Sequence, residues 1–215
     1  MSPIIIPTIL AATGNEARDK FALMRTAQWV QVDCVDGKFA QSKTWYDARA
    51  AGLMGISANL ELDLMVRDPR PVIQVWRKLK NLQRVIWHVE IKTDHAKLIR
   101  ECKKWKLEVG LALNPETPPT AVFPFLKDLD CVLLLGVHPG KSGQKLIPSV
   151  KKKIKVIQTF TPKLPIEWDG GLTAGNLKSF AKMGVTRFCM GSAIFDAKDP
   201  GKQLKKLQSL IKSRG

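Results

Sequence analysis

The sequence alternates between short apolar runs and amphipathic segments from one end to the other, and this alternation limits the folds open to it. Eight apolar runs, at roughly 25-residue spacing, are predicted as strands at 3–8, 28–34, 58–65, 83–88, 107–113, 131–137, 164–169 and 186–190. Segments with helical periodicity lie near 15–27, 44–54, 69–80, 94–105, 119–128, 148–159, 174–183 and 200–212. Strands that alternate with helices form parallel sheets with the helices outside. We therefore expect an α/β fold, a closed (β/α)8 barrel that forms one domain over residues 1–215, with an open doubly wound sheet as the alternative.

The chain length and composition are those of one well-filled core. Of the 215 residues, 45% are hydrophobic, which is enough for one domain and little for two. No apolar run reaches the about 18 residues that span a bilayer. The start of the chain lacks the basic region of a signal peptide, and its apolar part is too short for one. The four cysteines lie far apart in apolar segments, at Cys34, Cys102, Cys131 and Cys189. We therefore expect free buried thiols, a cytoplasmic location and no membrane partner.

A formal net charge of +16 raises the question of a polyanionic partner. Much of the excess lies in lysine-rich segments such as KKKIK at 151–155, where Val150, Ile154 and Ile157 follow helical spacing. This pattern is typical of an amphipathic helix with a solvated basic face. The sequence has neither zinc-finger spacing nor an RNA-binding aromatic motif. A solvated face is therefore the favoured interpretation, a nucleic-acid partner is not expected, and the positive field suits an anionic small substrate equally well.

Three of the predicted strands end in a polar residue, one further residue and an aspartate. The pairs are Gln31 and Asp33, Glu61 and Asp63, and Glu167 and Asp169. Side chains two apart on a strand point to the same side, and buried charge is costly without a partner. In a (β/α)8 barrel the carboxyl ends of the strands form the active-site mouth. We therefore expect the aspartates to line a polar pocket at that end of the barrel.

Asp33 and Asp169 end the second and seventh predicted strands, on roughly opposite sides of the mouth. Two facing carboxylates can remove a proton from one face of a carbon and return a proton to the other face. The pair thus predicts a two-base site that inverts a stereocentre next to a carbonyl. The alternative is structural, with each aspartate capping its own turn, as Asp commonly does.

Three glycine-containing turns can bind a phosphate through backbone N–H groups. They are HPGKSGQ at 138–144, DGGLTAGN at 169–176 and MGSAIF at 190–195. In (β/α)8 barrels the phosphate site is often built from the loops after strands 7 and 8. Gly170, Gly171, Gly191 and Ser192 lie in those loops, and we expect them to hold a phosphate.

Taken in order, these segments resemble the ribulose-phosphate 3-epimerase family. The resemblance runs from about Ile4 to Pro200 through IPTILAA, WVQVDCVDGKF, LELDLMVRDP, HVE, LALNPETP, VLLLGVHPGKSGQKLIPSVKKKI, WDGGLTAGN and GSAIFDAKDP. It implies a (β/α)8 barrel that interconverts D-ribulose 5-phosphate and D-xylulose 5-phosphate, with Asp33 and Asp169 as the acid/base pair. It also implies phosphate-binding loops that contain Gly143, Gly170, Gly171, Gly191 and Ser192, and it is the basis for expecting a homodimer.

The sequence departs from this family at the metal site. The family holds a divalent cation with two histidines and two aspartates, and Gln31 and Asp63 stand where the histidines are expected. Loss of both imidazoles removes the ligands best suited to zinc. An oxygen-only set of Gln31, Asp33, Asp63 and Asp169 suits Mg²⁺ or Mn²⁺ better than Zn²⁺. Without a cation, the three carboxylates repel one another, and the pKa of at least one of them should rise.

Further departures surround the expected substrate. Thr8 replaces the serine that follows the first strand, Val35 and Leu135 replace methionines, and Met65 keeps the third methionine. The loop after the sixth strand also differs, with His138 at its start.

Two histidines end predicted strands, and each has two interpretations. His138 is placed to polarise a substrate oxygen or to donate a proton, or it is an ordinary loop residue. His88 is either a hydrogen-bonded residue of the pocket wall or a substrate contact.

The sequence as a whole predicts an isomerase that acts on a small sugar phosphate. The expected substrate or phosphate contacts are Thr8, Met65, His88, His138, Gly140, Gly143, Gly170, Gly171, Gly191 and Ser192. Two alternatives remain: a sugar-phosphate enzyme of the same fold with changed specificity, and a non-catalytic phosphate-binding homologue with a degenerate metal site.

Overall fold

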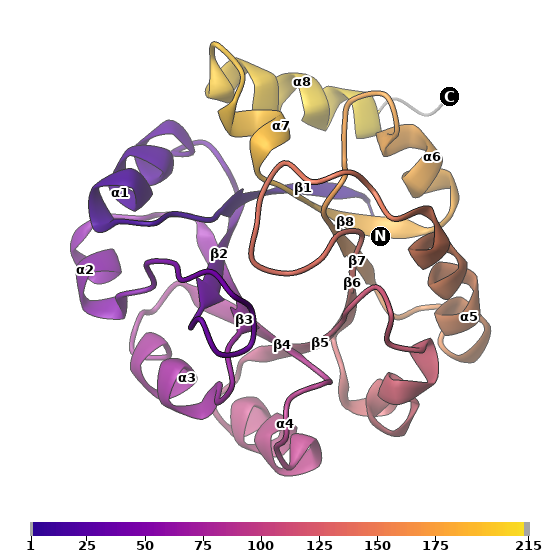
Figure 1. Ribbon diagram of the computed structural model, residues 1–215. Coiled ribbons are helices and arrows are strands. Elements are labelled where there is room, and N and C mark those ends of the chain that lie inside the picture. The colour runs from indigo at the N-terminus through magenta and orange to yellow at the C-terminus, as the bar shows by residue number, and fades with distance from the viewer. Residues whose placement is uncertain (1, 213–215) are drawn as a thin grey trace.

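The computed structural model describes residues 2–212 and shows a closed barrel of eight parallel strands (Figure 1). Each strand pairs with its neighbours in sequence, and β8 closes the barrel on β1. The strands are β1 Ile4–Ile9, β2 Trp29–Val35, β3 Asn59–Met65, β4 Leu82–His88, β5 Glu108–Leu113, β6 Cys131–Leu135, β7 Ile166–Asp169 and β8 Val185–Met190. The predicted (β/α)8 barrel is therefore confirmed, and the open doubly wound sheet is wrong.

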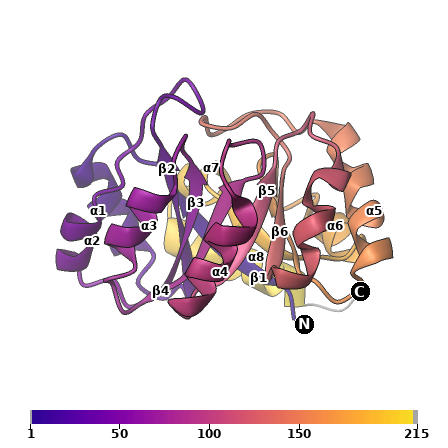
Figure 2. The same cartoon turned by 90° about the horizontal axis from the view of Figure 1, so that it is seen from below.

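The helices form a ring around the outside of this barrel (Figures 1 and 2). They are α1 Gly14–Leu23, α2 Ala48–Leu53, α3 Arg70–Trp76, α4 His95–Lys104, α5 Lys152–Phe160, α6 Leu177–Lys182, α7 Ser192–Phe195 and α8 Pro200–Lys212, with 3-10 helices η1 Pro119–Asp128 and η2 Pro148–Lys151. Side chains of Thr13, Asp47 and Asp94 begin α1, α2 and α4 by accepting hydrogen bonds from first-turn N–H groups. Across residues 2–212, no helix combines the length and the apolar character needed to cross a membrane.

Three predicted helices are shorter in the structure: α1 ends at Leu23, α2 begins at Ala48 and α3 ends at Trp76, where 27, 44 and 80 were predicted. Three further segments differ in their start or in their type. Residues 119–128 form 3-10 turns and no α-helix, because Pro124 lacks a donor in the middle of the segment and its ring obstructs an α-helical turn. The helix predicted from 174 begins only at Leu177, since Asn176 folds the preceding residues into a turn by accepting from Thr173 N at 2.9 Å. The short helix α7 follows Gly191, where only a turn was predicted.

The two faces of the strands are filled differently. Outward side chains pack under the helices, as Trp168 of β7 does against Phe180 of α6, with ring centroids 4.5 Å apart. Inside the barrel, an apolar cluster covers the β4–β6 side and consists of Ile86, Ala112, Cys131, Leu133 and Leu135. All four cysteines are buried and free, as predicted. Since the apolar residues occupy one side of the interior, the inward polar residues of β2, β3 and β7 gather on the other side.

The interior of the barrel contains a charged group that is buried except at Glu108 and, in part, Arg187. We call it the Arg84 cluster: Arg84, Glu61, Glu167, Glu108 and Arg187. Arg84 donates hydrogen bonds to Glu61 and, from Nε, to Glu108 at 2.8 Å, and its Nη1 lies 3.4 Å from Glu167 Oε2. Arg187 Nη1 lies 3.8 Å from Glu167 Oε2. Glu61 and Glu167 are fully buried. Two of the three predicted acidic strand ends therefore place their first carboxylate in this cluster and only their aspartate at the mouth.

The stability of the protein should depend on pH through Glu61. Burial raises the pKa of Glu61 to about 8, with the Glu167 carboxylate adding to the rise and Arg84 opposing it. The folded protein thus keeps a proton that the unfolded chain releases near the ordinary pKa of 4.5. This contribution to stability is complete below the unfolded value and is lost as the pH rises through about 8. We expect urea denaturation to show an unfolding free energy that falls over this range, and a flatter profile in Glu61→Gln; equal slopes in the two proteins would contradict this assignment.

Candidate active site

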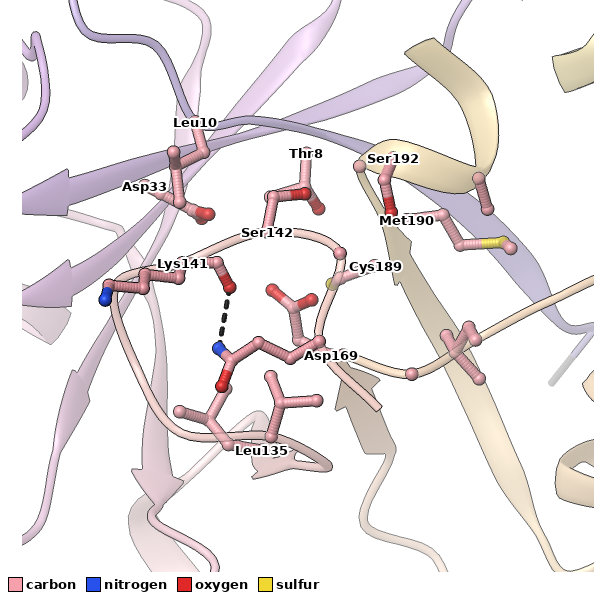
Figure 3. Close-up of a pocket in the computed structure, with 18 of the residues that line it drawn as sticks. Thr8, Leu10, Asp33, Leu135, Lys141, Ser142, Asp169, Cys189, Met190 and Ser192 are labelled. Atoms are coloured by element: carbon pink, nitrogen blue, oxygen red, sulfur yellow. Dashed lines mark hydrogen bonds between the residues drawn. The ribbon is translucent and has the colours of Figure 1, made fainter. Parts of the chain in front are cut away.

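A pocket of about 470 Å³ opens at the carboxyl ends of the strands (Figure 3). Its lining contains Asp33, Asp63 and Asp169 and every predicted substrate or phosphate contact except His88, namely Thr8, Met65, His138, Gly140, Gly143, Gly170, Gly171, Gly191 and Ser192. The mouth of the barrel thus brings together residues from both ends of the chain, as the positions of the strand ends predicted.

Three aspartates from three strands line the floor of this pocket, and the buried side chain of Gln31 contacts two of them. Gln31 and Asp33 share the inner side of β2, and Asp63 lies directly opposite Asp33 in the β2–β3 ladder. Gln31 Nε2 donates to Asp33 Oδ1 at 2.9 Å and to Asp169 Oδ2 at 2.7 Å. One carboxylate oxygen of each aspartate lies within 4.8 Å of the others. We call Gln31, Asp33, Asp63 and Asp169 the mouth quartet.

The three carboxyl groups of the mouth quartet have raised pKa values. Burial raises the pKa of Asp33 to about 6, and the hydrogen bond from Gln31 limits the rise. Burial and the charges of Asp33 and Asp169 hold the pKa of Asp63 well above its ordinary range. The pKa of Asp169 is also well raised, by burial and then by Asp33. The predicted rise therefore occurs at all three carboxyl groups and follows first from desolvation, with like-charge repulsion adding to it at Asp63 and Asp169.

The mouth quartet offers oxygen ligands that lack a hydrogen-bond partner. Both carboxylate oxygens of Asp63 and the amide oxygen of Gln31 are buried and unpaired among the described residues. Buried acceptors of this kind cost free energy unless a donor or a cation meets them. Three carboxylates and an amide oxygen form a donor set for a hard divalent cation, so these residues fit the kind of metal that the sequence predicted.

A second acidic group lies deeper, where Glu61, Glu167 and Cys189 come close together. Arg84 already donates to Glu61 and lies against Glu167, and Cys189 Sγ lies 3.1 Å from Glu167 Oε1. A guanidinium therefore occupies the place where a cation would compensate these charges, and this group forms part of the Arg84 cluster.

The loops after β7 and β8 form a glycine-rich wall beside the mouth quartet. Gly170 and Gly171 have positive φ values of 90° and 69°, which turn the backbone sharply at the end of β7. Gly191 and Ser192 join β8 to α7 on the neighbouring side. A side chain at these positions would narrow the wall, since a Cβ on Gly171 would lie 2.7 Å from Leu146 Cβ. The wall thus brings the backbone of these loops to the pocket without side chains that would cover it.

Gly170→Ala is expected to raise KM for a sugar phosphate about tenfold or more. A left-handed φ costs an L-residue about 1–3 kcal/mol, and the added Cβ would lie 2.4 Å from Val137 Cγ2, so the loop must move. About 1.4 kcal/mol corresponds to each factor of ten. Steady-state kinetics measure the effect, with Gly55→Ala as the control, because Gly55 has a φ of 64° but open space around it. Equal KM values in the two variants would contradict a role for this wall in binding.

The loop after β6 crosses over the mouth and carries Lys141 and Ser142 toward it (Figure 3). Ser42 from the loop after β2 donates to Gly140 O at 2.5 Å. Gln144 Nε2 donates to His138 O at 2.7 Å and to Lys141 O at 2.8 Å, which holds the loop in a compact turn. His138 lines the pocket but is exposed, and its Nδ1 lies 3.6 Å from Glu116 Oε1.

His88 lies beside the mouth quartet and not on the pocket surface. It is fully buried, with Nε2 at 3.8 Å from Asp63 Oδ1 and Nδ1 at 3.3 Å from Glu90 Oε2. Its ring packs against Phe39, with centroids 4.5 Å apart. The His88 ring is enclosed and does not reach the pocket, so a direct substrate contact does not fit this position. His88 instead lies next to Asp63, behind the pocket surface.

Several apolar residues of the lining were missed by the sequence interpretation. Leu10, Val137, Leu146 and Met190 line the pocket without belonging to a polar pattern. Leu10 lies two residues beyond Thr8, so strand parity could have found it. Val137 and Leu146 lie in the loop after β6, whose path depends on the folded chain, and Met190 is the last residue of β8.

Comparison with known proteins gives the family. A family model described as the ribulose-phosphate 3 epimerase family matches residues 4–195. The chain belongs to the ribulose-phosphate 3-epimerase family. A ribulose-phosphate 3-epimerase of Mycobacterium leprae is 28% identical over 205 residues, covering 93% of this chain and 91% of the relative. The cytoplasmic isoform of Oryza sativa subsp. japonica is 29% identical over 214 residues, covering 96% and 93%. The family is one of epimerases, which are isomerases.

Solved structures with low sequence identity share the fold of this epimerase family member. The 3-hexulose-6-phosphate synthase of Salmonella typhimurium has a TM-score of 0.73 at 17% identity and covers 97% of this chain and 98% of its own. KGPDC from Streptococcus mutans has a TM-score of 0.73 at 14% identity, with coverage of 98% and 97%. These likenesses concern the barrel alone.

Proposed function

We propose that this member of the epimerase family interconverts D-ribulose 5-phosphate and D-xylulose 5-phosphate. The observation that carries the proposal is the pair Asp33 and Asp169, which come from different strands, reach one pocket and lie beside the glycine-rich wall. The matched relatives bear the name of this reaction. A pocket of about 470 Å³ is of the size that small ligands occupy.

In this proposal, the protein binds the phosphate at Gly170, Gly171, Gly191 and Ser192, with Gly140 and Gly143 in the loop above. Backbone N–H groups at such turns suit an anion. Phosphate binding at this wall places the sugar carbons over the floor of the pocket. Thr8 and Met65 contact the sugar from β1 and β3, and His138 reaches it from the loop after β6.

The two aspartates exchange the proton at C3. The ionised carboxylate of one takes the proton as the C3–H electron pair moves toward the C2 carbonyl, which gives an enediolate. The protonated carboxyl group of the other then delivers a proton to the opposite face of C3. Burial raises the pKa of both carboxyl groups above the ordinary range, which brings an acid/base pair closer to neutral pH.

We further propose that Gln31, Asp33, Asp63 and Asp169 hold a divalent cation, Mg²⁺ or Mn²⁺ in preference to Zn²⁺. The unpaired oxygens of Asp63 and Gln31 support this assignment. When bound, such a cation supplies a Lewis acid that stabilises negative charge on the substrate oxygens. The cytoplasmic name of the Oryza sativa relative agrees with a cytoplasmic place for the reaction.

The test is proton exchange at C3 of D-ribulose 5-phosphate in D2O, followed by NMR, with chelated protein and after addition of Mg²⁺, Mn²⁺ or Zn²⁺. We expect deuterium at C3 together with formation of D-xylulose 5-phosphate. Absence of exchange under every condition, in protein that still binds the sugar phosphate, would overturn the epimerase proposal and favour a phosphate-binding homologue without this chemistry.

A further inference from the structure

Gln31 occupies the centre of the mouth quartet in an orientation that a cation would reverse. Its NH2 group is the point where Asp33 and Asp169 meet, at 2.9 Å from one carboxylate and 2.7 Å from the other. Its amide oxygen is buried and has no partner among the described residues. An amide that donates to both carboxylates reduces their repulsion, since each receives a hydrogen bond. It also directs the positive end of its dipole at the place where a cation would lie.

We propose that the Gln31 amide has two positions: its NH2 group bridges Asp33 and Asp169 in the cation-free site, and it rotates by about 180° to place its carbonyl oxygen against a bound Mg²⁺ or Mn²⁺. The inference rests on the proposed cation at this site. In the cation-free site, Gln31 then reduces the repulsion between Asp33 and Asp169. In the cation-bound site, its carbonyl oxygen is a ligand that favours hard cations.

The distances in the site suit this exchange. Rotation about the last side-chain bond exchanges nitrogen and oxygen with little change of shape, so the oxygen takes the place of Nε2 at 2.9 Å from Asp33 Oδ1 and 2.7 Å from Asp169 Oδ2. Adjacent oxygen ligands of an octahedral Mg²⁺ lie about 3 Å apart, and opposite ones about 4.2 Å, for bonds of about 2.1 Å. One carboxylate oxygen from each of the three aspartates lies within 4.8 Å of the others. After small side-chain movements, these oxygens can therefore surround a single small cation.

The surroundings of Gln31 permit both positions. Gln31 is fully buried, so water does not compete for its amide. Thr8 lies opposite Gln31 in the β1–β2 ladder, and its buried hydroxyl oxygen has no partner either, so β1 offers an acceptor for the rotated NH2 group. Asp63 contributes two further unpaired oxygens. A histidine in place of Gln31 could not exchange an oxygen for a donor, and its nitrogen would favour zinc.

The first test is an NMR titration of the full chain, labelled with ¹⁵N, with Mg²⁺, which is diamagnetic. The side-chain NH2 resonances of Gln31 are assigned by their loss in Gln31→Met. We expect them to shift on Mg²⁺ binding as both protons leave their carboxylate acceptors, and to saturate with the calorimetric binding curve. Resonances that stay in place while Mg²⁺ saturates the protein would overturn the rotation.

The second test compares Mg²⁺ affinity by calorimetry in Gln31→Met and Gln31→Glu. If the amide oxygen is a ligand, Gln31→Met should bind Mg²⁺ about tenfold or more weakly, and Gln31→Glu, which has oxygen at both positions, should bind it more tightly. If Gln31 only spaces the carboxylates, Gln31→Met should bind Mg²⁺ at least as tightly as the wild type, because no hydrogen bonds are broken, and the proposal falls. The control is Gln158→Met on α5, whose amide donates to Met183 O at 3.2 Å and should leave the affinity unchanged.

These outcomes separate the inference from the epimerase proposal. If the chelated protein exchanges the C3 proton, and calorimetry detects no Mg²⁺ binding to it, the proposed role of Gln31 is overturned and the epimerase proposal stands. Mg²⁺ binding with a shift of the Gln31 resonances but without exchange at C3 would remove the epimerase and leave the role of Gln31 standing.

Discussion

Asp33→Asn and Asp169→Asn are each expected to lower the rate of epimerisation by about two to four orders of magnitude. Each substitution removes one of the two groups that exchange the C3 proton, and interconversion requires both. The remaining aspartate still faces one side of C3. Each variant should therefore exchange the C3 proton of only one of the two sugar phosphates with D2O, and the two variants should select opposite ones. NMR of D-ribulose 5-phosphate and D-xylulose 5-phosphate, incubated separately with each variant, measures this.

The control is Asp19→Asn on α1, whose side chain is 75% exposed, and which should leave both exchange reactions unchanged. If a single aspartate exchanged the proton at both faces of C3, the variant that keeps this aspartate would exchange the C3 proton of both sugar phosphates. The variant that lacks it would exchange neither. That result would replace the two-base assignment with a one-base mechanism.

Arg84→Met is expected to lower the unfolding free energy by about 3–5 kcal/mol, because it leaves Glu61 and Glu167 buried without their principal cation. Arg84 also packs on Trp29, with its guanidinium carbon 4.3 Å from the ring centroid, and this contact is lost as well. For a chain of this size, each kcal/mol corresponds to about 2–4 °C. The melting temperature should therefore fall by roughly 6–20 °C in thermal unfolding followed by circular dichroism.

The matched control is Arg18→Met, since Arg18 lies on the surface of α1 and its side chain is 63% exposed. Above the pH at which Glu61 ionises, adding Glu61→Gln to Arg84→Met should recover part of the loss, because one uncompensated carboxylate is removed. A melting temperature unchanged by Arg84→Met, or lowered further by the second substitution, would show that the charges of this cluster do not stabilise the barrel.

The direction of the mouth side chains could be predicted from the sequence, but their contact partners could not, and the reason is physical. Parity on a strand depends only on the chain, so the common direction of Gln31 and Asp33 followed from their separation by two residues. The partner of each side chain depends on where other strands lie. The contact between Gln31 and Asp169, the enclosure of His88 behind Asp63, and the pairing of Glu61 with Arg84 therefore required the closed barrel.

The sequence by itself determined the barrel, the family resemblance and the residues at the ends of the strands. It did so because apolar periodicity, glycine turns and short motifs are local properties of the chain. Only the tertiary structure decided which acids reach the mouth and which are neutralised below it. It also showed that the amide of Gln31 lies between Asp33 and Asp169. Those facts depend on distances between strands that are far apart in sequence, and only the packed barrel sets them.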